Sequence, residues 1–158
     1  MNDFTHLDDK GKINMVDVGA KTVSHRTATA RCIVHLPAEV LSKLSGGDIQ
    51  TKKGSVFQTA IIAGIMAAKK TGDLIPLCHP LGLEHCNVHI SMNGQNELVI
   101  DCTASITAKT GIEMEALVGA SIAALTVYDM CKALSHDIVI KETKLIEKTG
   151  GKHDFKRA

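Results

Sequence analysis

Aromatic side chains are almost absent from this chain: its 158 residues include no Trp, one Tyr and three Phe. Proteins that bind single-stranded nucleic acids or RNA loops use aromatic rings as stacking platforms, so this shortage disfavours that class. The chain also has no excess of charge of either sign, because it contains 18 Lys and Arg residues and 17 Asp and Glu residues. Without an overall positive field, nucleic acid is not an expected partner, and any anion site must be local.

Long hydrophobic runs are also missing. The longest apolar stretch, residues 59–68, is much shorter than a membrane span, and residues 1–7 contain no apolar signal region. The five cysteines are odd in number and show no CxxC spacing, which is typical of reduced thiols rather than of a disulfide framework. We therefore expect a cytoplasmic protein without a membrane partner.

What the chain does have is enough apolar material for one domain. Its length is typical of a single domain, and 44% of its residues are hydrophobic. Because these residues are aliphatic and small rather than aromatic, the core is expected to bring backbones close together.

The periodicity of apolar residues predicts one domain, residues 27–148, between an N-terminal arm, residues 1–26, and a flexible C-terminal tail, residues 149–158. The expected elements, in the order strand, two helices, strand, strand, helix and strand, cover residues 27–36, 38–44, 54–71, 86–92, 98–106, 113–134 and 138–147. This order is that of an α+β, ferredoxin-like (split βαβ) fold with a doubled first helix. It implies an antiparallel sheet with helices on one face and the last strand at an edge.

The helix predicted over residues 113–134 carries large side chains on one stripe, which we expect to face the core. The stripe consists of Met114, Leu117, Val118, Ser121, Ile122, Leu125 and Tyr128. Asp129 and Lys132 are three residues apart on a face that continues from Leu125. If that face is buried, the two groups shift each other's pKa toward values useful for proton transfer. If it is exposed, they form an ordinary surface ion pair.

Two prolines, Pro76 and Pro80, stiffen the backbone around Cys78 and His79 in an otherwise apolar segment. His79 is a candidate general acid or phosphate contact. The alternative is a histidine whose ring is satisfied by backbone groups.

A zinc site built from the nearby Cys and His residues is disfavoured by the strand period. Cys86 faces the core, whereas His85 and His89 face the other way, so these side chains do not converge on one ion.

Several lysines lie next to glycines and are candidate anion contacts. They are Lys53, Lys109 and the lysines of residues 147–152, and none of them belongs to a P-loop spacing. Glu113 and Glu115 follow Lys109 and are either part of a site or carboxylates that complement a helix N-terminus. For Lys53 and the lysines of residues 147–152, the alternative is that they are solvated surface side chains.

Long contiguous motifs stand along the whole chain. They cover residues 5–6, 15–18, 64–69, 74–81 (LIPLCHPL), 109–116 (KTGIEMEA) and 128–133 (YDMCKA). In order and spacing they closely resemble the molybdenum cofactor biosynthesis protein C family, MoaC, essentially from end to end.

This resemblance implies a ferredoxin-like subunit in a homohexamer of three dimers, with a GTP-derived triphosphate as substrate. It also implies a lyase, cyclic pyranopterin monophosphate synthase. Such an enzyme rearranges (8S)-3',8-cyclo-7,8-dihydroguanosine 5'-triphosphate to cyclic pyranopterin monophosphate and releases pyrophosphate, in molybdopterin biosynthesis. No cofactor is required by this reaction without redox change. Mg²⁺ could accompany the triphosphate, although no dedicated protein site is visible.

Carried over position by position, the resemblance makes Asp129 and Lys132 the acid and base, with Lys53 as a third catalytic group on the phosphates. The substrate-binding positions would be Asp17, Arg26, Leu77, Cys78, His79, Glu113, Met114 and Glu115, of which Arg26 and His79 contact phosphates. Two departures from the family are Gly19, where Ser is frequent, and Ser55, where the pattern is usually Lys-Gly-Asp.

Two other functions stay open, a non-catalytic nucleotide-binding module and a structural oligomerisation domain. The spacing of the candidate residues also bears on the assembly. Glu115 and Asp129 are 14 residues apart, which is about 21 Å along a helix. Two such helices crossing antiparallel near Ile122, through the small residues around Gly119, would bring Glu115 of one subunit to Asp129 of the other. We therefore expect a site shared across a dimer interface.

Overall fold

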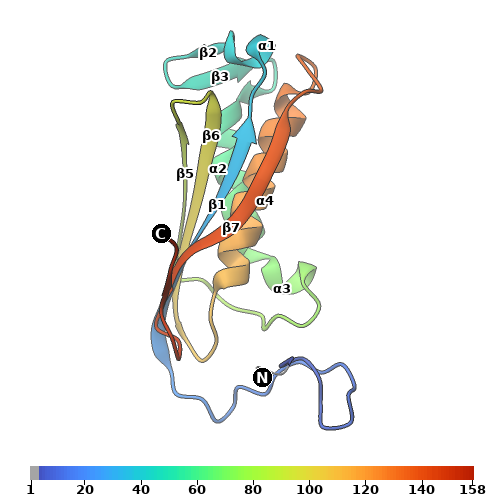
Figure 1. Ribbon diagram of the computed structural model, residues 1–158, viewed down its shortest axis with the longest axis vertical. Helices are drawn as coiled ribbons and strands as arrows, with labels where there is room; N and C mark the ends of the chain where they lie inside the picture. Colours follow the sequence, from blue (N-terminus) through green and yellow to red (C-terminus); the bar gives the residue numbers. More distant parts are fainter. Residues whose placement is uncertain (1–3) are drawn as a thin grey trace.

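Helices cover one face of an antiparallel sheet in this computed structural model, which describes residues 4–158 (Figure 1). The sheet contains β1 (Ser24–His35), β5 (His85–Met92), β6 (Glu97–Ala108), β7 (Val139–Thr149) and β8 (Phe155–Lys156). Its strand order is β5-β6-β1-β7-β8, and neighbouring strands run antiparallel. In β1 and β6, buried residues alternate with half-buried ones, as the period of two predicts.

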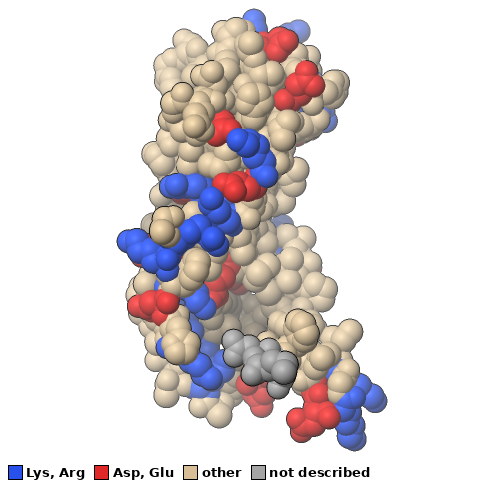
Figure 2. Space-filling view, in the orientation of Figure 1, with Lys and Arg blue, Asp and Glu red and all other residues tan. Residues whose placement is uncertain are grey.

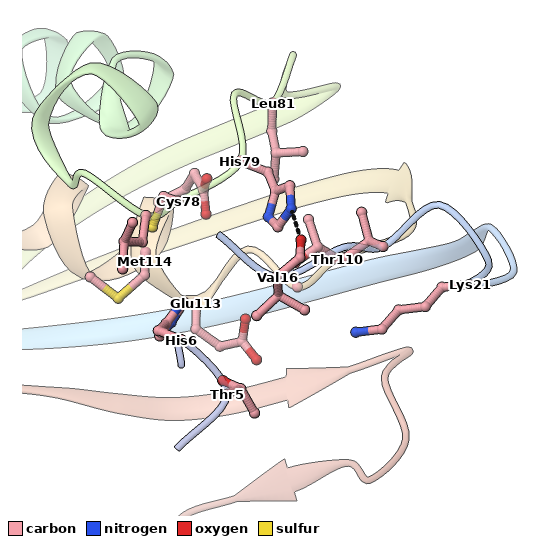
Figure 3. Close-up of a pocket in the computed structure, with 14 residues that line it drawn as sticks. Thr5, His6, Val16, Lys21, Cys78, His79, Leu81, Thr110, Glu113 and Met114 are labelled. Carbon is pink, nitrogen blue, oxygen red and sulfur yellow. Dashed lines mark hydrogen bonds between the residues drawn. The ribbon is translucent and has the colours of Figure 1, made fainter. Parts of the chain in front are cut away.

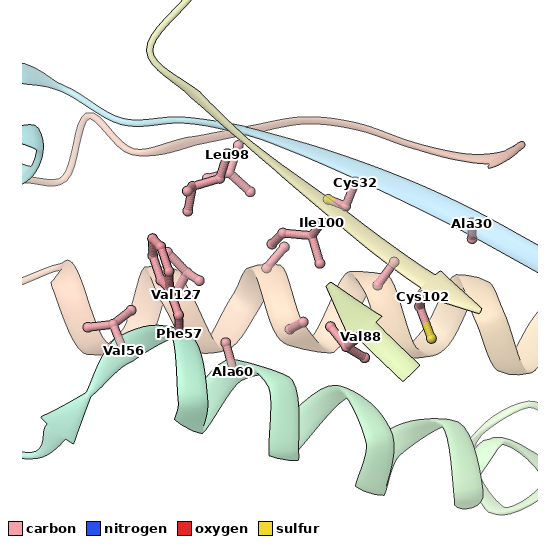
Figure 4. Close-up of a cluster of buried hydrophobic side chains, with 14 of the residues drawn as sticks. Ala30, Cys32, Val56, Phe57, Ala60, Val88, Leu98, Ile100, Cys102 and Val127 are labelled. Carbon is pink, nitrogen blue, oxygen red and sulfur yellow. The ribbon is translucent and has the colours of Figure 1, made fainter. Parts of the chain in front are cut away.

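Two long helices, α2 (Val56–Lys69) and α4 (Glu113–Cys131), form the second layer. Helix α4 packs on β1, β6 and β7, and α2 packs on β5 and against α4. Aliphatic side chains such as Ile100 and Val127 fill the space between the layers (Figure 4). The four long strands and their two crossover helices follow the ferredoxin-like order, so the expected α+β fold with helices on one face is confirmed.

The doubled first helix is confirmed, although its parts are shorter than expected. The first helix, α1 (Ala38–Leu41), is a single turn, and α2 is followed by the short α3 (Thr71–Leu74). Between α1 and α2 the chain forms a small sheet of β2 (Leu44–Ser45), β3 (Asp48–Thr51) and β4 (Gly54–Ser55). Gly46 and Gly47 have φ angles of 59° and 79°. This left-handed backbone makes a tight β2–β3 turn where a helix end was expected.

The tail predicted to be flexible is a hairpin. Strand β8 pairs with Glu147 and Lys148 of β7, so β7 is not an edge strand at that end. The Gly150 N–H donates to Asp154 Oδ1 at 3.1 Å, and the Arg157 N–H donates to the Ile146 carbonyl at 2.8 Å. Gly150 permits this return because its φ is 85°, and a Cβ there would lie 2.0 Å from a carbonyl of β1.

Helix α4 turns the opposite face to the core from the one expected. Its buried residues are mostly small, among them Gly119, Ala120 and Ala123, whereas Leu125 is 52% exposed. The two helices touch through their glycines, since a Cβ on Gly64 would lie 2.8 Å from the Gly119 carbonyl oxygen. The small residues therefore serve the contact between α2 and α4 within one chain, and the stripe of large side chains faces outward.

By length and composition alone, α4 resembles a membrane-spanning helix. However, 56% of that apolar stretch is buried inside the fold. Its apolar character is accounted for by its place between the sheet and α2, as the core helix of the domain.

Candidate active site

A cavity of about 390 Å³ lies at the N-terminal end of α4. Three segments far apart in the sequence form its walls: the N-terminal arm, the loop after α3 and the start of α4 (Figure 3). Six of the predicted substrate-binding residues line it, namely Leu77, Cys78, His79, Glu113, Met114 and Glu115. The arm contributes Thr5, His6, Val16, Val18 and Lys21. Residues 1–3 of the expected arm lie outside the described residues.

Polar contacts hold the arm across this cavity. His79 Nε2 donates to the Val16 carbonyl oxygen at 2.7 Å (Figure 3). Lys109 Nζ donates to the Gly19 carbonyl oxygen at 2.8 Å. Asp17 does not line the cavity; its carboxylate accepts the Gly19 N–H at 2.8 Å within the arm's own turn. His79 thus makes the backbone contact that the sequence left as an alternative, and its ring also faces the cavity.

Two carboxylates at the start of α4 occupy unlike environments. Glu115 is 3% exposed, and burial, with the neighbouring charge of Glu113, raises its pKa. Burial opposes ionisation of Glu113 too, but a hydrogen bond from Lys148 at 2.9 Å, with the charges of Lys148 and Arg26, holds its pKa below the ordinary value. Two acidic groups with pKa values pushed apart can divide the roles of proton donor and acceptor.

A second cavity of about 740 Å³ adjoins the first, sharing Lys21, Gly111 and Glu113 with it. Its wall carries cations from three segments, Lys21 and Arg26 from the arm and β1, and Lys148 and Lys152 from the end of the chain. Arg26 is held by the carbonyls of Ala108 and Lys109, at 3.1 and 3.3 Å.

On β7 and β8, two lysines outside this cavity are paired with carboxylates. Lys144 pairs with Glu142 and Lys156 with Glu147 along β7 and β8. Figure 2 shows basic and acidic side chains interleaved on this face. In a chain of near-zero net charge, the second cavity is a place where four cations from distant segments of the sequence meet.

The predicted catalytic residues lie at the other end of α4. Lys132 Nζ is 2.7 Å from Asp129 Oδ1, and Lys53 Nζ is 3.8 Å from Asp129 Oδ2. The expectation that this face is buried was wrong, because these three side chains are 51% to 65% exposed. The hydrogen bond from Lys132, with the charge of Lys53, lowers the pKa of Asp129, and Asp129 raises the pKa of Lys132. None of the three lines either cavity described above.

Lys21 and Lys148 were not singled out as individual site residues. Lys148 stood only as one of the lysines in residues 147–152. Lys21 stands outside any periodic segment or recognisable motif, so nothing in the sequence pointed to it. Both line the second cavity because the arm, which carries Lys21, and the end of β7, which carries Lys148, lie beside the start of α4.

Known proteins resemble this chain along most of its length. The profile of the MoaC family matches residues 15–151. A cyclic pyranopterin monophosphate synthase of Xanthomonas campestris pv. campestris (strain B100) is 53% identical over 152 residues, covering 96% of this chain and 92% of that protein. The synthase of Desulforapulum autotrophicum is 49% identical, covering 96% and 93%.

A third relative is a longer protein. The molybdenum cofactor biosynthesis bifunctional protein of Synechocystis sp. is 53% identical over 155 residues, and the chain spans 45% of its length. The match to the family profile, which covers most of the chain, and the relatives of equal length lead to one conclusion: the chain belongs to the MoaC family.

Proposed function

We propose that this chain is a cyclic pyranopterin monophosphate synthase. It converts (8S)-3',8-cyclo-7,8-dihydroguanosine 5'-triphosphate to cyclic pyranopterin monophosphate and pyrophosphate, a lyase step of molybdopterin biosynthesis. The observation that carries the proposal is the junction of the two cavities. One contains carboxylates with divergent pKa values, and the other, which shares Glu113 with it, is lined by four cations.

The cation-lined cavity suits the triphosphate. In the reaction, a substrate hydroxyl oxygen bonds to the α-phosphorus, the bond between the α- and β-phosphates breaks, and pyrophosphate leaves with the electron pair. Arg26, Lys148, Lys152 and Lys21 would stabilise the charge that gathers on the leaving group. Arg26 suits this task because its guanidinium is already oriented by two backbone carbonyls.

The first cavity suits the ring system derived from guanine. Glu115, whose pKa is raised, favours its protonated form and can give a proton, while Glu113, whose pKa is lowered, stays ionised and accepts donors. Met114, Leu77 and Cys78 offer apolar contact around the ring, and His79 keeps the arm closed over it. Opening one ring and closing another requires several proton transfers, which such a set of groups supplies.

Asp129, Lys132 and Lys53 complete this site only if they come from a second copy of the chain. The helix between Glu115 and Asp129 separates them by about 21 Å. The outward stripe of α4 includes Leu125, and α2 also presents apolar side chains to solvent, Ile62 and Met66; each of the three is at least half exposed. Apolar surface of this kind fits an isologous dimer, in which each copy supplies one end of α4 to each site. Three such dimers would form the homohexamer.

No protein-bound metal is part of the proposal. Within residues 4–158, the structure gathers no group of three or more His, Cys, Asp or Glu side chains suited to hold an ion. Any Mg²⁺ would enter with the triphosphate, which supplies oxygen ligands of the kind that Mg²⁺ prefers. We place the reaction in the cytoplasm, because all five cysteines are free thiols, as a reducing compartment keeps them.

The decisive experiment is incubation of the purified protein with the cyclic triphosphate. We expect cyclic pyranopterin monophosphate and an equal amount of pyrophosphate. Binding of the triphosphate without either product would instead identify a nucleotide-binding module. If the protein neither binds the triphosphate nor forms product, a structural oligomerisation domain is the remaining alternative.

A further inference from the structure

The lysine nearest Asp129 is carried by a short hairpin. Strands β3 and β4 pair Gln50 with Ser55 and Thr51 with Gly54, which leaves Lys52 and Lys53 as a two-residue turn. The Lys53 N–H donates to Thr51 Oγ1 at 3.0 Å, so the backbone of the turn is fixed relative to its own strands. The direction in which Lys53 points then depends on how the whole hairpin is seated against α2.

The carboxylate of Asp48 fixes the β3–β4 hairpin against the start of α2. Asp48 Oδ1 accepts the N–H groups of Ile49 at 2.6 Å and Phe57 at 2.9 Å, and Asp48 Oδ2 accepts a hydrogen bond from the Ser55 hydroxyl. The Ser55 oxygen in turn accepts the Gln58 N–H at 3.1 Å as the N-cap of α2. Asp48 therefore joins the first strand of the hairpin, the last strand of the hairpin and the first turn of α2.

Asp48 itself lies outside the proposed chemistry. It lines neither of the two cavities and forms no ion pair with Lys53 or Lys132. Burial opposes its ionisation, but the Ser55 hydroxyl and the backbone N–H groups hold its pKa below the ordinary value, so the carboxylate is charged at neutral pH. Its charge reaches Cys131 at the end of α4, where burial and then Asp48 raise the pKa of the thiol.

We propose that Asp48 is a positioning residue for Lys53: through Ser55 and the start of α2 it sets the hairpin so that Lys53 meets Asp129 and Lys132. The inference rests on the proposed function, in which Lys53 acts on the substrate. Removal of Asp48 leaves two backbone N–H groups and the Ser55 hydroxyl without their acceptor, so it should also lower the melting temperature. A catalytic group misplaced by about 1 Å can cost about 100-fold in rate. A loss of turnover caused by misplacement should depend on the presence of Lys53, whereas a loss of stability should not.

A double-mutant cycle separates positioning from general damage. Asp48→Ala should lower kcat/KM by about 10-fold to 100-fold, with the same division between kcat and KM as Lys53→Ala. In the Lys53→Ala background, Asp48→Ala should cost less than about twofold more, because there is no amine left to position. Asp48→Asn, whose amide oxygen still accepts the two backbone N–H groups and whose amide nitrogen can donate to the Ser55 oxygen, should keep most of the activity.

Two further variants serve as control and safeguard. Asp101→Asn breaks the pair with Arg31 at 2.7 Å on the sheet, far from the hairpin, and should lower the melting temperature without loss of turnover. Ser55→Ala cuts the Asp48 link from the other side while Asp48 keeps its backbone contacts. It should reproduce the defect if Asp48→Ala does not fold.

The outcomes are distinguishable. Normal turnover in Lys53→Ala would refute the role of Lys53 in the proposed function, and this inference with it. An impaired Lys53→Ala together with a folded, fully active Asp48→Ala or Ser55→Ala would overturn the inference alone. Losses that add in the double variant would also overturn it, because they would show general destabilisation.

Discussion

The two ends of helix α4 carry the proposed reacting groups in opposite surroundings. At the N-terminal end the arm, the loop after α3 and the last strand enclose Glu113 and Glu115, and the latter is nearly inaccessible to solvent. At the C-terminal end, Asp129 and Lys132 stand in solvent with Lys53. Burial is the main cause of the raised pKa of Glu115 at the N-terminal end. At the C-terminal end, the hydrogen bond from Lys132 is the main cause of the lowered pKa of Asp129.

Under the proposed function, this contrast means that one chain would build only part of a reaction chamber. The enclosed end has walls, cations and a carboxylate of raised pKa, whereas the open end carries the proposed proton-transfer groups and lines neither cavity. An exposed ion pair contributes little to stability. A function in a partner's cavity would explain why these three charged residues meet at the surface.

The largest effect is expected at the open end. Asp129→Asn or Lys132→Ala should lower kcat by about 10²-fold to 10⁴-fold, because each removes a proton-transfer group. The melting temperature should change by only about 1 °C, since the side chains are exposed. Product formation and thermal unfolding measure the two effects. Lys144→Ala, which breaks an equivalent exposed pair on β7, is the control. Near-normal product formation in either site variant would remove the catalytic assignment.

Mixing variants tests whether the two ends meet across subunits. Chains with Glu115→Gln and chains with Asp129→Asn should each be inactive alone. After subunit exchange, a mixed dimer holds one doubly damaged site and one intact site, so random pairing should restore about a quarter of all sites.

Mass spectrometry of the exchanged dimers is the necessary control for that mixture. If exchange is complete and activity stays at the level of the separate variants, the shared site is wrong. If Glu115→Gln is active on its own, Glu115 is dispensable and the two ends need not meet.

A smaller effect concerns the middle of α4, between the two ends. Gly64→Ala should lower the unfolding free energy by about 1–3 kcal/mol, because the new Cβ meets the Gly119 carbonyl oxygen and Val88. This exceeds the gain of about 1 kcal/mol in helix propensity. Gly82→Ala, where a Cβ meets nothing within 4 Å, is the control in denaturant unfolding. An unchanged Gly64→Ala would mean that the small residues of α4 do not serve the contact with α2.

The four long strands were predictable because side chains in a half-buried sheet alternate between the buried and the exposed face, as in β1 and β6. The short strands β2, β3, β4 and β8 were not predicted. The identity of the buried face of α4 also could not be predicted. A hydrophobic stripe containing Leu125 was expected inside, yet the close contact of α2 with α4 is made where the buried face of α4 carries small residues such as Gly119 and Ala123. Large side chains then face outward, where a rule based on hydrophobicity alone does not place them.

The site was predictable to the extent that its residues stand in contiguous motifs. His79 and Glu115 were named from such motifs, and the structure brings them to one cavity. Lys21 and Lys148 depend on how the arm and the last strand fold back, a long-range contact with no local pattern. The turn at Gly150 that returns the tail is likewise visible only in three dimensions.

The smallest expected effect is a dependence of stability on pH that differs between the two ends. Burial, and then the charge of Glu113, raises the pKa of Glu115, so the folded state favours its protonated form. The stabilisation is complete below the ordinary glutamate pKa and is lost as the pH rises through the raised value. Glu115→Gln places a permanently neutral side chain at this position.

The unfolding free energy of Glu115→Gln should therefore match that of the unchanged protein at pH 4 and exceed it at pH 8, by no more than about 1–2 kcal/mol. At the open end, Asp129→Asn should show no such gain at pH 8, because pairing with Lys132 lowers the pKa of Asp129 and favours its ionised form. Chemical denaturation at both pH values measures the difference, and an advantage of Glu115→Gln that shrinks toward pH 8 would contradict the buried, protonated carboxyl at the enclosed end.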